Sequence, residues 1–360
     1  MLTSKKSSFI LSPQFGSLKY LLPVFISFFI FVLASFSNLF IEFSNLNFFN
    51  NSSLNEKAFS VIKLPRFQLF ILIAPILSIT LSEVIYNLFS KKNLYYNLSI
   101  LKVSRSKGYK FADIWYYIFT HLTLKFRFLL GITSFGYSYF SDAAKNFIHI
   151  NLQKYSFFEH QSLTVAIFAI LALDFYGYLS HRIQHGFPLM WSLHEFHHSA
   201  TQMTIFSNSR RTVLEDLYSI VLLPITVLSG FLLAQLLQSS SYSAFVFLLF
   251  YYAYSSFSGD VAHSSFRVVY PKWLSFFLMS PSLHWIHHSS NPKHFNKNFG
   301  TFFTFWDKAF GTYLGEEHLC DVKEFGVKGS YYNKVHPFTS YFIIPIKRVF
   351  KKNKKIFFQK

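Results

Sequence analysis

The residues of this sequence best suited to chemistry are its histidines, because eight of them fall into three compact motifs. The motifs have the forms HxxxH, HxxHH and HxxHH. Their histidines are His181 and His185, then His194, His197 and His198, then His284, His287 and His288. Spacings of three and four residues place side chains on one face of a helix. Imidazole nitrogen binds iron, zinc, copper and nickel, and eight imidazoles exceed what one ion can bind. The motifs therefore predict a catalytic site that holds two metal ions.

Chance does not explain this pattern. A random chain with 15 histidines in 360 residues would contain a given HxxHH motif about 0.03 times. Any single histidine could equally be a hydrogen-bonded polar residue at a membrane edge. That interpretation fails for the whole set, so we treat the three motifs as one constellation.

Two further histidines are candidate metal ligands, and two aspartates are candidates to orient ligands. His263 and His294 lie close to the motifs in the sequence, and we add them to the eight as metal ligands. Asp174 could orient a ligand of the first motif or simply pack between helices, and Asp260 could orient His263. The remaining histidines lack cluster spacing, and we expect none of them to bind metal: His121, His149, His160, His318 and His336.

Local signals place the motifs on short helices. Gly186 and Pro188 follow His185 and predict a helix end there. Ser192 and Glu195 have the spacing of a capping box, so we expect Glu195 to be a capping partner rather than a metal ligand. Ser280 and Pro281 predict the start of the helix that carries the third motif.

Charged residues just after the second motif have a simpler interpretation. Arg210, Arg211 and Glu215 are spaced as a structural ion-pair cluster. We expect them to stabilise the fold rather than to take part in chemistry.

The composition indicates a membrane protein. Charged residues make up 14% of the chain, whereas a soluble domain carries about 25%. The net charge of +18 fits the positive-inside rule and anionic headgroups, and the apolar runs argue against nucleic acid as a partner. The single cysteine, Cys320, excludes an intrachain disulfide and a cysteine-based zinc or iron–sulfur site.

The apolar runs predict an all-α integral membrane protein with about six transmembrane helices, or four plus re-entrant or interfacial helices. The candidate spans are 18–41, 67–90, 111–140, 161–180, 213–237 and 242–262. The third contains charged residues such as Asp113 and Lys125, which are costly at membrane depth unless they face protein or reach the interface. Basic residues in 91–110 predict that this loop is cytoplasmic. If the third span crosses the membrane, the histidine-rich helical cap lies on the same side, and the basic C-terminal end agrees with this topology. We expect an N-terminal hairpin and loop over 1–110, a membrane-embedded oxidase domain over 111–318 and a basic tail over 319–360.

The motifs and the residues around them resemble the fatty acid hydroxylase superfamily, in its sterol desaturase branch. The stretch from Asp174 to His185 is similar to the first box of that family. Residues 291–313, which we name the closing segment, contain the runs NPKH, KNFG, FWD and FGTY and resemble its last part. Asn296 departs from the pattern, because relatives often have an acid there. The resemblance covers roughly residues 165–315.

The resemblance implies a lipid hydroxylase or desaturase that uses two iron ions, O2 and two external electrons. Zinc could replace iron in recombinant protein. The substrate would be a fatty acyl chain, a sterol, an ether lipid or a carotenoid that enters from the bilayer. Electrons would come from a cytochrome b5-, ferredoxin- or reductase-type donor. The membrane would be the bacterial inner membrane or the endoplasmic reticulum. Two alternatives stay open: a catalytically silent protein with structural zinc, and a metal transporter, although transporters hold their ligands at mid-membrane.

Overall fold

The computed structural model describes residues 65–89, 97–104, 109–122, 162–212, 214–215, 258–265 and 267–350. Within these residues the fold is helical, with two isolated antiparallel bridges and no sheet. The candidate span 18–41 lies outside them, as do most of 213–237 and 242–262 and the second half of 111–140. None of the described helices combines the length and the apolar character needed to cross a bilayer.

Most of the described helices are short, and the longest have 25 residues. In chain order they are α3 (Pro65–Phe89), α5 (Ser99–Val103), α6 (Ala112–Leu122), α9 (Ser162–Gly186), α10 (Pro188–His198), η3 (Ser207–Ser209), α14 (Lys272–Ser275), α15 (Pro281–His287), η5 (Pro292–His294), α16 (Phe305–Ala309), η6 (Glu316–Asp321), η7 (Thr339–Ile343, a π-helix) and α17 (Ile344–Phe350). Residues 258–262 are also helical.

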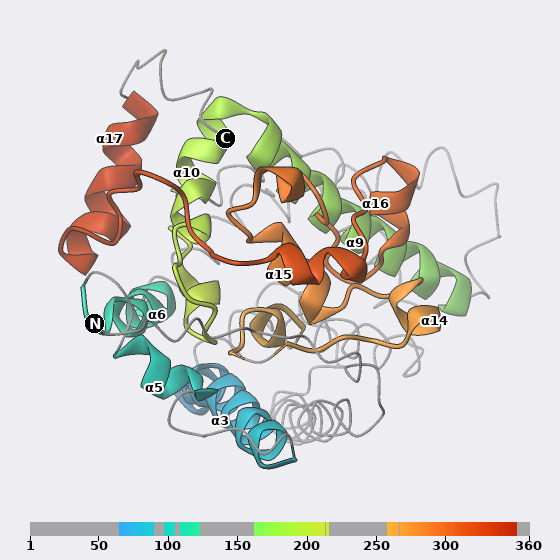
Figure 1. The fold of residues 1–360 in the computed structure, drawn as a ribbon, viewed down its shortest axis with the longest axis horizontal. Coiled ribbons are helices and arrows are strands. Elements are labelled where there is room, and N and C mark those ends of the chain that lie inside the picture. The colour runs from blue at the N-terminus through green and yellow to red at the C-terminus, as the bar shows by residue number, and fades with distance from the viewer. Residues whose placement is uncertain are drawn as a thin grey trace, which may run out of the picture.

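The elements that carry the histidine motifs lie at the centre of the molecule. Figure 1 shows α9 in green and α10 in yellow-green, with the orange α15 labelled near the middle of the view. The early helices α3, α5 and α6 lie on one side, and α17 lies beyond α10. Three hydrophobic clusters support this arrangement. One joins α3, α5 and α6 to residues 205–206 and 261–270, one surrounds α15 and η6, and one joins α6, α10 and η7.

The helix ends around the motifs follow two of the three sequence signals. Helix α9 ends at Gly186, as predicted, and Pro188 opens α10 after the extended residue Phe187. Ser280 caps α15, because its Oγ accepts a hydrogen bond from the Leu283 amide at 3.3 Å, with Pro281 in the first turn. Both patterns work because they satisfy or remove amides that lack a partner inside the helix.

The predicted capping box at Ser192 and Glu195 is wrong. Helix α10 begins at Pro188, so Ser192 lies inside the helix, and its Oγ donates to the Leu189 carbonyl at 2.6 Å. The Glu195 carboxylate accepts from Arg348 of α17 at 2.6 Å. Proline presets the backbone for the first helical turn, and in α10 it moves the helix start ahead of the serine.

Buried ion pairs join distant parts of the chain. The Arg210 guanidinium donates to Asp113 of α6 at 2.6 Å and to the Asn333 side chain at 2.8 Å. It also donates to the Ser199 hydroxyl, just after α10, at 2.8 Å. Arg210 is therefore structural, as expected, but its acidic partner is Asp113. The buried Glu83 carboxylate accepts from the amides of Ser99 and Ser265, which fixes the loop that follows His263.

Candidate metal centre

The structure brings nine of the ten histidines predicted as ligands together in two groups. The five-histidine group consists of His181, His185, His194, His198 and His287. The four-histidine group consists of His197, His263, His284 and His288. Within each group, one ring nitrogen from every member lies within 4.8 Å of those from all the others. The tenth, His294, belongs to neither group and lies near His318 and Asp321 instead.

The geometry of the helix divides each HxxHH motif between the groups. Residues four apart on a helix differ by about 40° in direction, whereas adjacent residues differ by about 100°. In α10, His194 and His198 therefore point into the five-histidine group, and His197 points into the other. In the third motif His284 and His288 share the four-histidine group, and His287 points across to the five-histidine group.

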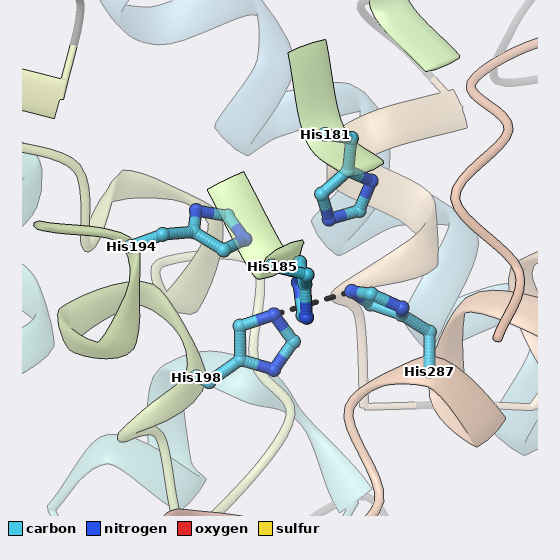
Figure 2. Close-up of side chains that lie close together, drawn as sticks. All are labelled: His181, His185, His194, His198 and His287. Atoms are coloured by element: carbon cyan, nitrogen blue, oxygen red, sulfur yellow. Dashed lines mark hydrogen bonds between the residues drawn. The ribbon is translucent and has the colours of Figure 1, made fainter. Parts of the chain in front are cut away.

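The two groups are contiguous. The rings of His198 and His288 stack at 4.3 Å between centroids, although they belong to different groups. Figure 2 shows the five-histidine group, whose imidazoles from α9, α10 and α15 point toward one common centre. The dashed line in Figure 2 joins Nε2 of His198 and Nε2 of His287, which are 3.2 Å apart. Two adjacent centres, each lined by imidazole nitrogens, can thus be built from this one cluster.

The outer ring nitrogens of the five-histidine group contact fixed acceptors. Nδ1 of His194 lies 2.7 Å from the Glu215 carboxylate, Nδ1 of His287 lies 2.7 Å from the Lys297 carbonyl, and Nδ1 of His181 lies 3.1 Å from the Phe299 carbonyl. These oxygens can only accept, so each Nδ1 carries the proton and donates. Each Nε2 then carries no proton and points its lone pair inward, and this is the tautomer of imidazole that binds metal through Nε2.

The four-histidine group has inner contacts that suit a cation. Nδ1 of His263 donates to the Gly259 carbonyl at 2.6 Å, so its Nε2 carries no proton. That Nε2 lies 3.2 Å, 3.2 Å and 3.1 Å from the Nε2 atoms of three other rings, those of His197, His288 and His284. One lone pair cannot accept three hydrogen bonds. A metal ion with bonds of about 2.0 Å to four nitrogens in a tetrahedron would separate those nitrogens by about 3.3 Å, so the four residues fit such an ion.

Burial keeps these imidazoles in the metal-binding form. Desolvation lowers the pKa of His263 to about 4. The pKa values of His197, His284 and His288 are also held well below the ordinary value by burial, and neighbouring histidines add to the effect. Neutral imidazole is the ligand form, so the four-histidine group is ready to bind a cation at neutral pH.

The closing segment forms the wall that presents two of the acceptor carbonyls. Asp307 accepts from the amides of Phe299 and Gly300, each at 2.8 Å. The Asn298 side chain bridges Leu283 of α15 and Leu314, which ties the segment to the third motif. Asp174 of α9 accepts from the Phe302 amide at 2.9 Å and from the Trp306 indole at 3.0 Å. Of the two roles weighed for Asp174, these contacts fit packing. They hold the closing segment against α9.

Sequence reasoning assigned Glu215 to an ion-pair cluster and missed its contact with His194. Its Oε1 lies 3.7 Å from Arg211 but only 2.7 Å from Nδ1 of His194. Glu215 and Asp216 form an acidic pair shortly after the second histidine motif, and that pair is a signal that could have found the contact. The Nδ1 atoms of His181, His287 and His263 donate to backbone carbonyls. Every residue has such a carbonyl, so the sequence gives no sign of these contacts. Asp260, expected to orient His263, accepts from Asn208 at 2.7 Å instead.

The histidines expected not to bind metal give a mixed picture. His149 and His160 lie outside the described residues, and so does the side chain of His121. His336 is exposed and stacks edge-on against Tyr109. His318 is the exception, because it lies with His294 and Asp321.

Comparison with known proteins finds similarity to one family over this region. A model of the fatty acid hydroxylase family matches residues 166–312. The alkylglycerol monooxygenase of Caenorhabditis elegans is 30% identical over 152 residues, which is 42% of this chain and 27% of that protein. The human alkylglycerol monooxygenase is 26% identical over 159 residues, covering 41% of this chain and 30% of that protein. An ornithine lipid hydroxylase of Rhizobium tropici is 26% identical over 149 residues, 41% of each chain.

The matched stretch covers less than half of this chain in each case, and the chain spans less than half the length of each of these relatives. No solved structure matches the chain.

Proposed function

We propose, from the premise that residues 166–312 belong to the fatty acid hydroxylase superfamily, that this chain hydroxylates or desaturates a membrane lipid. The superfamily resemblance predicted from the sequence is confirmed by these matches. The proposed enzyme holds two iron ions, one in the five-histidine group and one in the four-histidine group. It takes O2 and two electrons from an external donor, and it belongs to a membrane with its histidine motifs on the cytoplasmic side.

The observation that carries this proposal is the pair of adjacent histidine groups. Nine imidazoles fall into sets of five and four, and four of their outer nitrogens donate to fixed oxygens. Two iron ions bound there would supply the activation of O2 and the oxidation of a C–H bond. The chain itself fixes the tautomer of four of these imidazoles, and burial keeps the imidazoles of the four-histidine group neutral.

A lipid substrate is supported by the relatives and by the surface of the molecule. The matched proteins are named for alkylglycerol and for an ornithine lipid, two amphipathic lipids with a polar head. Three aromatic side chains on and beside α14 are exposed, those of Trp273, Phe276 and Phe277. They lie close to the closing segment, because the Thr304 hydroxyl of that segment donates to the Phe276 carbonyl at 2.6 Å. Exposed aromatic residues of this kind favour the membrane interface. We therefore propose that an acyl or alkyl chain enters from the bilayer near α14.

Lipid analysis in an expressing host tests the proposal. Cells grown under ¹⁸O2 should accumulate a lipid that gains one ¹⁸O atom if the enzyme hydroxylates, or a lipid that loses two hydrogens if it desaturates. A double variant, His197→Ala with His287→Ala, removes one imidazole from each group and serves as the control. Identical lipid profiles from the wild type and the double variant, at equal protein levels, would contradict the proposal and favour a silent metal-binding protein.

A further inference from the structure

A second kind of histidine site lies outside the two groups, where η5 meets η6. His294 ends η5, whereas His318 and Asp321 stand three residues apart on η6. One ligand atom from each of the three residues lies within 4.8 Å of the other two. Nδ1 of His318 is 3.6 Å from the Asp321 carboxylate, and the rings of His294 and His318 are 6.3 Å apart. None of the three residues belongs to the five- or four-histidine group.

The buried imidazole of His294 indicates that this cluster has a ligand. The side chain is fully buried, and within the described part of the chain neither ring nitrogen has a hydrogen-bond partner. A buried polar group without a hydrogen-bond partner is destabilising, so native structures seldom leave one in place. His318 and Asp321 each bring a ligand atom within 4.8 Å of one on His294, and both are partly exposed, so their side chains can turn toward it.

We propose that His294, His318 and Asp321 bind a third divalent metal ion, separate from the two proposed iron ions. Two imidazole nitrogens and one carboxylate oxygen suit zinc, with a water molecule in the fourth position. Zinc ligands in a tetrahedron lie about 3.3 Å apart, so the three side chains close only slightly from their present positions.

The position of the site indicates what a bound ion does there. It joins η5 to η6 and so closes a loop that contains Lys297 and Phe299, whose carbonyls accept from His287 and His181. Helix η6 also carries Glu316, whose carboxylate accepts from the Ser280 hydroxyl, the cap of α15. The ion is therefore a structural brace that holds the wall of the neighbouring centre in position. Its existence does not depend on the proposed lipid chemistry.

Zinc binding to iron-loaded protein tests this inference. Protein loaded with iron without oxygen is dialysed against Zn²⁺, and zinc and iron per chain are both counted by elemental analysis. The wild type is expected to gain one zinc while its iron content stays unchanged. His318→Ala and Asp321→Asn change exposed side chains that touch neither histidine group, and both variants should lose that zinc. His336→Ala, which removes an exposed histidine elsewhere, should keep it.

Three outcomes would overturn the inference. The first is a wild type that gains no zinc. The second is equal zinc uptake by the wild type and His318→Ala. The third is zinc uptake matched by an equal loss of iron in every variant, because that result would place the zinc in the nine-histidine centre. Thermal unfolding gives an independent readout, since Zn²⁺ should raise the midpoint of the wild type but not that of Asp321→Asn.

Discussion

Whether an inward-facing ring nitrogen of the centre can bind metal depends on the contact that the other nitrogen of the same ring makes, because that contact fixes the proton on the outer nitrogen. In His194 that contact is a carboxylate, Glu215, and in His181, His263 and His287 it is a backbone carbonyl. A carbonyl keeps its place as long as the backbone does, but a carboxylate can be removed by one substitution. Glu215 is therefore the residue at which this orienting role can be tested without changing a proposed ligand.

Removing the Glu215 carboxylate should weaken the centre. In Glu215→Ala, Nδ1 of His194 loses its acceptor, and we expect metal affinity or activity to fall about 10–100-fold, as such changes typically do. Glu215→Gln keeps an oxygen that can accept and should restore part of the loss. Arg211→Gln removes the 3.7 Å ion pair to Glu215 but leaves the contact with His194, so it should keep most of the activity. Equal losses in Glu215→Ala and Arg211→Gln would assign Glu215 to the ion pair alone.

At the scale of the helices, local residues decide where each helix begins and ends, whereas tertiary packing decides what it contacts. This difference explains why some of the site could be predicted and some could not. The ends of α9 and the start of α15 follow local signals, Gly186 and Ser280, because a helix end is decided within one turn. The prediction that histidines three and four residues apart share a helix face holds for those four apart, whereas His194 and His197, three apart, point into different groups. Helix geometry separates His197 from His194 and His198, but which histidines of other elements each of them meets depends on how α10 packs against the rest of the molecule, and tertiary packing decides that. Glu195 was misassigned for the same reason, because its partner, Arg348, is 153 residues away.

The turn at Gly300 should be sensitive to a single added carbon. A Cβ at this position would lie 2.5 Å from the Phe303 carbonyl and 2.9 Å from the Asp307 carboxylate. Gly300→Ala should therefore displace the neighbouring carbonyls of Phe299 and Lys297, and metal content and thermal stability should both fall. Gly186→Ala is the matched control, because a Cβ there meets nothing within 4 Å. If the two variants bind metal equally well, the closing segment does not position the ligands.

On the scale of the whole molecule, the centre gathers segments that are far apart in the sequence. Residues 181–198, 263 and 284–288 supply the imidazoles, and Glu83 and Asp174 fix the loops beside them. The apolar composition predicted a membrane protein. Its topology rests on spans that lie mostly outside the described residues, so the sidedness and the domain boundaries at 110 and 318 stay predictions.

Burial of so many neutral histidines should make the metal-free protein sensitive to acid. The folded-state pKa of His263 is about 4, whereas an unfolded histidine has a pKa of about 6.5. Below pH 6.5 the unfolded chain therefore binds more protons than the folded one, and the free energy of unfolding decreases as the pH falls toward 4. His197, His284 and His288 shift in the same direction. Thermal unfolding of metal-free protein between pH 7.5 and 4.5 measures the effect, and a midpoint that does not fall would contradict it.

The number of iron ions bound per chain tests the central claim most directly. Protein purified without oxygen, reconstituted with Fe²⁺ and passed over a weak chelator should retain two iron ions per chain, because the five-histidine and four-histidine groups each fit one. His197→Ala and His287→Ala should each reduce that number, since each removes an imidazole from a different group. A folded wild-type chain that retains one iron ion or none would contradict the account.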